Sequence, residues 1–175
     1  EKKLENTNLT PIPDIEESIF FAFEKVAIPK TKRILKIDLP VLEVPNKVLA
    51  KNIHLDVSGP MHSCIIGKNG SGKTTLLRKI KEELENRKDI KLGYMPQFYE
   101  EVFKDYETVL DFISKGKSKE EITKARMYLG NMNFTSDEMT GKISNLSNGT
   151  KAKLLLMKFV LEKCDVLLLD EPTRN

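Results

Sequence analysis

Gly67 to Thr75 is GKNGSGKTT, and this stretch decides the fold of the chain. It fits the pattern G-x-x-x-x-G-K-[ST], in which glycines let the backbone wrap closely and point its N–H groups at phosphate oxygens. Lys73 brings a cation to the outer phosphates, and the Thr74 hydroxyl is suited to ligate Mg²⁺. A helix that follows the loop directs its positive end at the same anion. The stretch therefore predicts a phosphate-binding loop whose nucleotide-binding residues are Gly67, Asn69, Gly70, Ser71, Gly72, Lys73, Thr74 and Thr75.

The residues on either side of this loop favour a nucleotide site over a chance glycine-rich turn. The apolar run Cys64 to Ile66 predicts a short strand before it. Apolar residues recur after it at the spacing of a helix packed on a sheet, at Leu76, Leu77, Ile80 and Leu84. A strand, a glycine-rich loop and a helix in this order confirm the motif, so the sequence predicts a P-loop NTPase.

A pair of carboxylates follows an apolar run near the end of the sequence. Val166 to Thr173 is VLLLDEPT, and its first four residues are typical of a buried parallel strand. Asp170 would then hold Mg²⁺, and Glu171 would lie beside the hydrolytic water. If no phosphate loop preceded them, a solvated acidic pair would be the better interpretation, because carboxylates prefer the surface.

A further motif precedes this strand. Leu146 to Thr150 is LSNGT, and an apolar helical segment follows it from Lys151 to Leu161. Ser147 is a good helix N-cap, helix N-termini favour anions, and Gly149 permits close approach of a ligand. A capped helix that packs on the sheet without any ligand explains the same residues equally well.

These motifs together resemble the ATP-binding cassette (ABC) family. LSNGT is similar to the family's signature sequence LSGGQ, and Tyr94 to Gln97, YMPQ, looks like its Q-loop. The four motifs occur in the family's order, and the resemblance covers roughly Ile34 to the C-terminus. The signature departs from the family at Asn148, where a glycine is usual, and at Thr150, where glutamine is usual. Asn tolerates left-handed backbone geometry, whereas Thr150 is shorter than glutamine and puts that side-chain contact in doubt.

The resemblance implies a catalytic site for Mg-ATP hydrolysis. Lys73, Gln97 and Glu171 would be its catalytic residues. Thr74, Gln97 and Asp170 would hold Mg²⁺. Gln97 would also reach the attacking water, although an ordinary loop glutamine after a proline is the alternative interpretation.

The resemblance also implies a partner. Ser147 and Gly149 would serve the nucleotide of a second cassette, either in tandem in the same protein or in a dimer. We therefore expect weak or absent ATPase activity from the isolated chain. ABC ATPases commonly stack adenine on an aromatic residue, and Val44 occupies that place in this sequence.

The implied fold is α/β, of the P-loop ABC type, with a mixed sheet core and a helical subdomain. Ile34 to Leu42 and Val48 to Val57 predict two strands joined by a turn at Pro45 and Asn46. Helices are expected at Thr108 to Ile113 and at Lys119 to Leu129. We divide the chain into an N-terminal extension or linker end (1–33), an ATP-binding core (34–97 with 145–175) and the helical subdomain (98–144).

Composition narrows the class of protein. Hydrophobic residues make up 39% and charged residues 31%, which indicates a soluble globular chain rather than a disordered one. No apolar run approaches the roughly 20 residues that span a bilayer, so direct membrane insertion is not expected. The net charge of +3 is too small to indicate nucleic-acid binding. Cys64 and Cys164 lack close spacing, which predicts buried reduced thiols in a cytoplasmic protein.

The assignment of the chain to one type of ABC protein depends on less specific features of the sequence. Asp111 to Asn148, with ARMYLG at Ala125 to Gly130, looks like the second cassette of an ABC-F protein, a soluble tandem ATPase that acts on ribosomes and in some cases confers antibiotic resistance. The sequence begins with Glu and shows no secretory signal, and we interpret it as part of a longer protein. The alternative is the ATPase subunit of a transporter, docked on a transmembrane partner. A nucleotide-binding module that dimerises without turnover is a third hypothesis, against which Glu171 argues.

Overall fold

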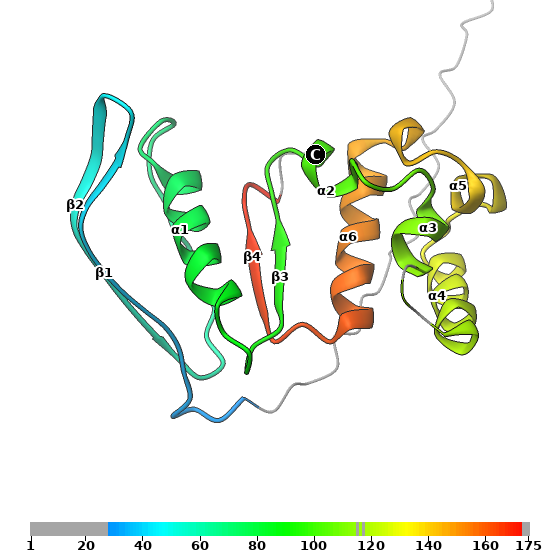
Figure 1. The fold of residues 1–175 in the computed structure, drawn as a ribbon, viewed down its shortest axis with the longest axis horizontal. Coiled ribbons are helices and arrows are strands. Elements are labelled where there is room, and N and C mark those ends of the chain that lie inside the picture. The colour runs from blue at the N-terminus through cyan, green and yellow to red at the C-terminus, as the bar shows by residue number, and fades with distance from the viewer. Residues whose placement is uncertain (1–27, 115, 117, 173–175) are drawn as a thin grey trace, which may run out of the picture.

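The computed structural model describes residues 28–114, 116 and 118–172. Figure 1 shows the elements side by side: a long hairpin, a helix, a pair of short strands, a second helix and a group of further helices. The predictions for residues 1–27 and 173–175 lie outside the described residues. The three-part division of the chain stays a prediction.

The hairpin consists of β1 (Arg33–Val44) and β2 (Lys47–Ser58), which pair antiparallel. Pro45 and Asn46 form its turn, with Asn46 at φ 65°, a conformation that Asn adopts at low cost. The turn sets the register, so that Val44 lies opposite Lys47. This confirms the predicted strand pair.

The helix α1 (Lys73–Glu85) begins directly at the predicted phosphate loop. Leu76, Ile80 and Leu84 are buried at intervals of four residues, which places them on one face of the helix. They pack in one hydrophobic cluster with the buried residues Ile34, Leu35, Ile37 and Leu42 of β1. The hairpin is therefore held against the helix that carries the loop.

Two parallel strands, β3 (Leu92–Met95) and β4 (Val166–Leu169), lie between α1 and α6 (Asn148–Glu162) in Figure 1. The backbone N–H of Asp170 donates to the carbonyl of Met95 at 2.9 Å, which extends the pairing by one bond. The strand predicted from the apolar run at Val166 is confirmed as β4. Among the described residues, the parallel pair and the antiparallel hairpin are separate ladders rather than one mixed sheet.

The helical segment comprises α2 (Glu100–Phe103), α3 (Val109–Ser114), α4 (Lys119–Asn131), α5 (Ser136–Thr140) and a 3-10 turn (Ile143–Asn145). A capping box begins α4 and another begins α5. In each, the side chains of the N-cap residue and of the glutamate three residues later accept hydrogen bonds from each other's backbone N–H, between Ser118 and Glu121 and between Thr135 and Glu138. Its buried side chains share a second hydrophobic cluster with α6. The helices predicted at 108–113 and 119–129 are confirmed.

The strand predicted at Cys64 to Ile66 is wrong. A strand requires ladder hydrogen bonds to a neighbour, and residues 61–68 form no ladder with any described residue. Ile66 is 87% exposed, and Cys64 is exposed as well. The prediction of buried thiols therefore holds for Cys164 alone, where burial raises the pKa of the thiol to about 11.

Gly93 is the residue that lets β3, β4 and α6 pack closely. A Cβ atom there would lie 2.7 Å from Leu167 Cδ2 and 2.9 Å from Phe159 Cγ. We expect Gly93→Val to lower the free energy of unfolding by about 1–3 kcal/mol, the usual cost of overpacking a core. Gly130→Ala is the control, because a Cβ atom there meets nothing within 4 Å and alanine favours the helix by about 1 kcal/mol. Urea unfolding that gave equal midpoints for the two variants would contradict this packing.

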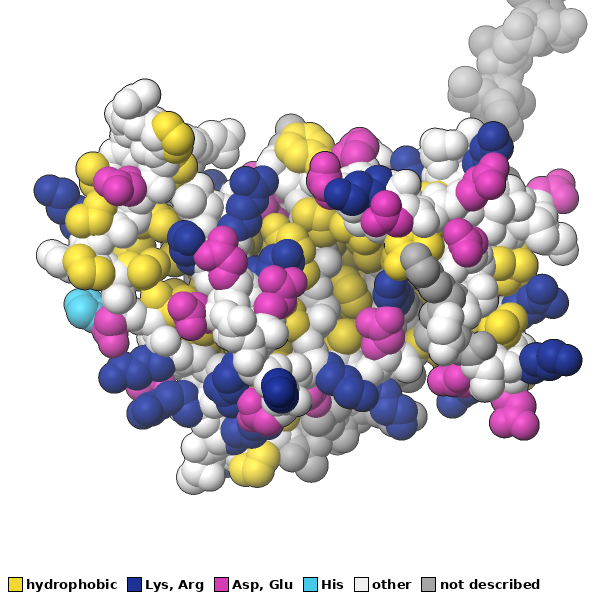
Figure 2. Space-filling view, in the orientation of Figure 1, with side chains coloured by type: hydrophobic (Ala, Val, Ile, Leu, Met, Phe, Trp, Pro, Cys, Tyr) yellow, Lys and Arg dark blue, Asp and Glu magenta, His cyan; other side chains and the backbone are white. Residues whose placement is uncertain are grey.

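The surface in Figure 2 mixes Lys and Arg with Asp and Glu, without a large area of one sign. Hydrophobic side chains show between α1 and α6 on this face. No helix in the part of the chain that the structure describes is long and apolar enough to cross a membrane.

Candidate nucleotide-binding site

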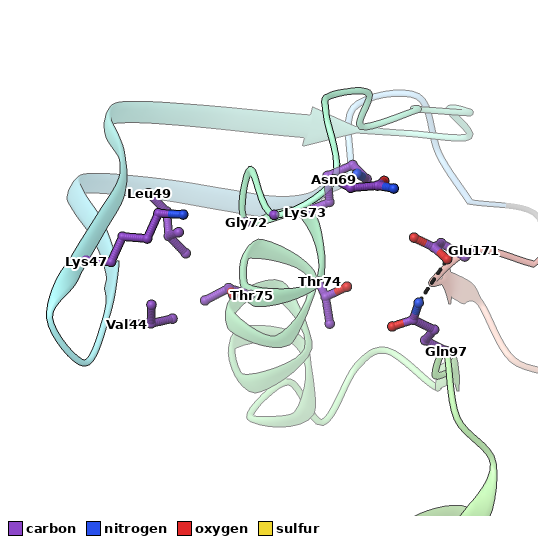
Figure 3. Close-up of a pocket in the computed structure, with 11 residues that line it drawn as sticks. Val44, Lys47, Leu49, Asn69, Gly72, Lys73, Thr74, Thr75, Gln97 and Glu171 are labelled. Carbon is purple, nitrogen blue, oxygen red and sulfur yellow. Dashed lines mark hydrogen bonds between the residues drawn. The ribbon is translucent and has the colours of Figure 1, made fainter.

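The predicted phosphate loop forms one wall of a cavity of about 800 Å³ (Figure 3). The tip of the β1–β2 hairpin forms the opposite wall, and the residues after β3 and β4 close the end. The cavity therefore joins segments that lie far apart in the sequence. Its lining is Val44, Lys47, Leu49, Asn69, Gly70, Gly72, Lys73, Thr74, Thr75, Gln97 and Glu171.

Two loop glycines adopt backbone angles that other residues rarely adopt. Gly70 has φ 75° and Gly72, the residue before α1, has φ 99°. Gly72 is also confined by space, because a Cβ atom there would lie 3.0 Å from Leu49 Cδ1. The hairpin thus packs directly on the loop, and the loop can bend around an anion as the sequence predicts.

The Lys73 ammonium folds back over the loop. It donates to the carbonyl oxygens of Gly67 at 3.0 Å and Lys68 at 3.2 Å. A backbone carbonyl oxygen is neutral, whereas the phosphate oxygens are negatively charged and accept a stronger hydrogen bond from an ammonium. The side chain is therefore placed to exchange these two contacts for contacts to a phosphate at the mouth of the loop.

Asp170 follows β4 and lies beside the start of α1. The Thr74 hydroxyl donates to Asp170 Oδ1 at 3.2 Å, although 96 residues separate the two in the sequence. Asp170 is 3% exposed, and its Oδ2 atom has no hydrogen-bond partner among the described residues. A buried carboxylate oxygen without a partner is costly unless a cation meets it. A hydroxyl and a carboxylate oxygen are the hard ligands that Mg²⁺ prefers, so the residues fit this ion.

Asp170→Asn is expected to weaken the dependence of ATP affinity on Mg²⁺. Asparagine keeps an oxygen for the Thr74 hydroxyl but removes the charge. In the complete protein, the tightening of ATP binding by Mg²⁺ should fall at least about tenfold, which corresponds to one charge-assisted contact of about 1.4 kcal/mol. Calorimetric titration with Mg²⁺ and with EDTA measures this effect. Asp137→Asn, at an exposed position on α5, is the matched control. A magnesium effect equal to that of the wild type would exclude Asp170 as a ligand.

Glu171 and Gln97 meet at the other side of the cavity. The Gln97 amide donates to Glu171 Oε2 at 2.9 Å, as the dashed line in Figure 3 shows. Glu171 has φ 51°, a strained angle for a residue with a side chain, and such strain concentrates at functional sites. The amide holds the carboxylate at the cavity wall. The structure brings both residues together with Lys73 and Thr74, as the motifs predict.

A second cavity, of about 440 Å³, opens between α1 and β3. Thr74, Gln97 and Asp170, the three predicted Mg²⁺ ligands, all line it. The proposed role of Gln97 as a ligand stays a prediction, since the hydrogen bond in the structure is made by its amide nitrogen.

Ser147 and Gly149 lie elsewhere, at the start of α6, and do not line the cavity. Ser147 Oγ accepts from the backbone N–H of Thr150 at 3.0 Å, so the predicted N-cap is confirmed. The nearest atom to a Cβ placed on Gly149 is Ser147 Oγ at 3.8 Å, so nothing in the described residues confines Gly149. Asn148 is the first residue of the helix and does not adopt a positive φ.

Two lining residues were not identified from the sequence. Val44 was placed by the resemblance, whereas Lys47 and Leu49 come to the cavity with the hairpin. The turn at Pro45 and Asn46 was the available signal, because it places Lys47 opposite Val44 and directs Leu49 to the same side as Lys47. The residues were missed because neither is a usual ligand type.

Comparison with known proteins identifies the family of the chain. A family model described as ABC transporter matches residues 50–174. The "Probable ATP-binding protein YheS" of Escherichia coli strain K12 is 29% identical over 99% of the chain and 28% of its own length. The "Ribosome protection protein VmlR" of Bacillus subtilis is 33% identical over 100% of the chain and 32% of its own length. Protein GCN20 of Saccharomyces cerevisiae is 29% identical over 99% of the chain and 24% of its own length.

The chain thus spans about a quarter to a third of the length of these curated relatives. A solved ABC transporter in an inward-facing conformation superposes with a TM-score of 0.58 and 22% identity, over 82% of the chain and 61% of that structure's chain. That likeness confirms the predicted α/β fold class. The chain belongs to the ATP-binding cassette family of ATPases, because the family model covers most of it and the relative VmlR is 33% identical over the whole length of the chain.

Proposed function

We propose that the complete protein hydrolyses Mg-ATP and acts on the ribosome in the cytoplasm. The observation that carries the hydrolytic part is the convergence of Lys73, Thr74, Gln97 and Glu171 on one cavity, with Asp170 buried beside it. A cation, a metal-binding pair and a carboxylate base are the groups that phosphoryl transfer to water requires.

Each side chain has a separate role in this reaction. Lys73 binds the outer phosphates, and Thr74 with Asp170 would hold Mg²⁺, which would neutralise charge on the phosphate oxygens. Water attacks the terminal phosphorus and ADP departs as the bond to the bridging oxygen breaks. The Glu171 carboxylate accepts the proton of the attacking water, and Gln97 keeps that carboxylate at the cavity wall.

We also propose that the start of α6 contacts a second nucleotide, one that is bound by another cassette. Glycine within a helix costs roughly 1 kcal/mol relative to alanine, and nothing in the described residues requires it at position 149. Its open side leaves room for the phosphates of a nucleotide held by a second cassette, next to the Ser147 hydroxyl. Composite sites of this kind support our expectation of weak or absent turnover by the isolated chain.

The ribosome is favoured over a membrane partner by the relatives. VmlR, whose name describes it as a ribosome protection protein, matches the whole chain at 33% identity. The transporter structure matches at 22% identity and supports the fold alone. We therefore propose a translation-associated ATPase, with the ATPase subunit of a transporter as the alternative.

Co-sedimentation with ribosomes tests this proposal. Glu171→Gln in the complete protein should slow hydrolysis and hold the cassettes closed on ATP, so the variant should pellet with ribosomes when ATP is present. Glu171→Gln combined with Lys73→Ala is the control, because it should bind no ATP and stay in the supernatant. If the Glu171→Gln protein binds ATP but never pellets with ribosomes, the transporter alternative takes precedence.

A further inference from the structure

Tyr94 of β3 projects towards the helix that carries the phosphate loop. It lies opposite the residue of β4 that is two places before Asp170. Side chains alternate along a strand, and a Cβ atom on Gly93 would meet Phe159 of α6, so Tyr94 projects from the other face. Its neighbour there is Lys81 of α1, whose ammonium lies 5.3 Å from the centre of the tyrosine ring. The ring is therefore fixed between β3 and α1.

The cavity of about 440 Å³ between α1 and β3 brings Tyr94 together with the proposed metal-binding pair. Thr74, Asp170, Tyr94 and Arg78 all line this cavity. Arg78 follows Thr74 by four residues, so the two side chains lie on the same face of α1. Tyr94 does not line the larger cavity that is proposed to hold the nucleotide. Its hydroxyl is thus near the metal-binding pair and away from the phosphates.

Asp170 is the carboxylate of this cavity that lacks a cation. Two other glutamates line the cavity, and each has a lysine partner: Glu82 pairs with Lys79 at 2.7 Å and Glu101 with Lys104 at 3.1 Å. Asp170 forms no ion pair with any residue that the structure describes, and one of its oxygens is buried without a hydrogen-bond partner there. The charge available to a donor in this cavity is therefore that of Asp170.

The Tyr94 hydroxyl is a donor that faces this charge. Burial raises the pKa of Tyr94, and the charge of Asp170 raises it further, whereas the charge of Arg78 opposes the rise. The hydroxyl therefore keeps its proton at neutral pH. A guanidinium has donors only, so Arg78 can meet only a lone pair of the phenol oxygen, and the proton is left for another acceptor. Thr74 and Gln97 also offer oxygens to the cavity, but a charged carboxylate accepts the stronger hydrogen bond.

We propose that Tyr94 is a positioning residue of the magnesium site. Arg78 holds the phenol oxygen, and the hydroxyl donates to the Asp170 carboxylate through one water, which keeps the carboxylate in the orientation that binds the ion. Groups that orient a metal ligand typically change metal affinity by about 10- to 100-fold when they are lost. Tyr94 acts on the ion through Asp170 and does not touch the nucleotide. This inference rests on the proposed function and adds to its metal site.

Calorimetric titration of the complete protein with ATP, in Mg²⁺ and in EDTA, tests the inference without measuring turnover. Tyr94→Phe removes only the hydroxyl. The tightening of ATP binding by Mg²⁺ should fall about tenfold, whereas the affinity for ATP in EDTA should stay within about twofold of wild type. Tyr128→Phe is the matched control, because it makes the same change on the exposed face of α4. It should keep the full magnesium effect.

A second variant tests the link to Arg78. Arg78→Met should reduce the magnesium effect by about the same factor, because the hydroxyl then loses the donor that fixes it. The double variant Tyr94→Phe with Arg78→Met should lose no more than either single variant, since the two side chains act as one unit. Arg126→Met, at an exposed position on α4, should bind ATP as the wild type does in both solutions.

Three results would overturn the inference. A wild-type magnesium effect in Tyr94→Phe would exclude the hydroxyl from the metal site. An equal loss of ATP affinity in Mg²⁺ and in EDTA would assign Tyr94 a structural role only. Fully additive losses in the double variant would separate Arg78 from Tyr94. If the wild type itself binds ATP equally in Mg²⁺ and in EDTA, the metal site of the proposed function fails instead.

Discussion

Glu171→Gln in the complete protein should reduce steady-state ATP hydrolysis by about 10²- to 10⁴-fold, the usual contribution of a general base. The glutamine keeps the shape of the side chain and can still accept from the Gln97 amide, whose bond to Glu171 is 2.9 Å long. It can no longer take a proton from water. Affinity for Mg-ATP should stay within about threefold of wild type, because Glu171 is placed beside the water rather than on the phosphates.

Phosphate release and equilibrium ATP binding, measured on the same preparation, separate these two effects. Glu85→Gln is the matched control, because this exposed glutamate lies at the far end of α1 and pairs with Lys81 at 3.1 Å. It should hydrolyse ATP at the wild-type rate. Hydrolysis by Glu171→Gln within about tenfold of wild type would assign the base to another residue.

Lys73→Ala should severely weaken ATP binding. The ammonium can make two charge-assisted contacts to phosphate, worth about 1.5–3 kcal/mol each, so affinity should fall by about 10²-fold or more. In the absence of nucleotide the variant loses only its hydrogen bonds to the carbonyls of Gly67 and Lys68, near the protein surface. Its melting temperature without ATP should therefore stay close to that of wild type.

The shift in melting temperature with added ATP measures this prediction. A ligand at about 100 times its Kd stabilises a protein by about 2.7 kcal/mol, which gives a clear shift in wild type. Lys73→Ala, with its affinity lowered about 10²-fold or more, should be stabilised by at most about 0.4 kcal/mol at the same concentration, so its shift should be a small fraction of that of wild type. Lys79→Ala, on an exposed turn of α1, should keep the full shift. A full ATP-induced shift in Lys73→Ala would show that the triphosphate binds outside the loop.

The sequence was sufficient where local chemistry decides structure. The turn at Pro45 and Asn46 needs a residue that tolerates positive φ, and Asn46 supplies it, so the hairpin could be predicted. Ser147 was identified as an N-cap because its hydroxyl can satisfy a free backbone N–H, and it does so at Thr150. The glycines of the phosphate loop could be predicted in the same way, because Gly70 and Gly72 adopt positive φ angles that glycine adopts at low cost.

The sequence was not sufficient where contacts between distant segments decide structure. Cys64 to Ile66 has strand composition, but a strand exists only where another segment pairs with it, and residues 61–68 make no ladder within the described structure. The bond between Gln97 and Glu171 depends on the register of β3 with β4, which no local pattern encodes. Lys47 reaches the cavity through the packing of Leu49 on Gly72, a contact across 23 residues that composition does not reveal.

The structure of the Glu171→Gln protein with Mg-ATP tests the central claim most directly. The account predicts that the Lys73 ammonium leaves the carbonyls of Gly67 and Lys68 and contacts the outer phosphates. It also predicts a magnesium ion between the Thr74 hydroxyl and the free oxygen of Asp170, and a base against Val44. A triphosphate bound outside the loop, with Lys73 still on the two carbonyls and Asp170 Oδ2 without a cation, would contradict the account.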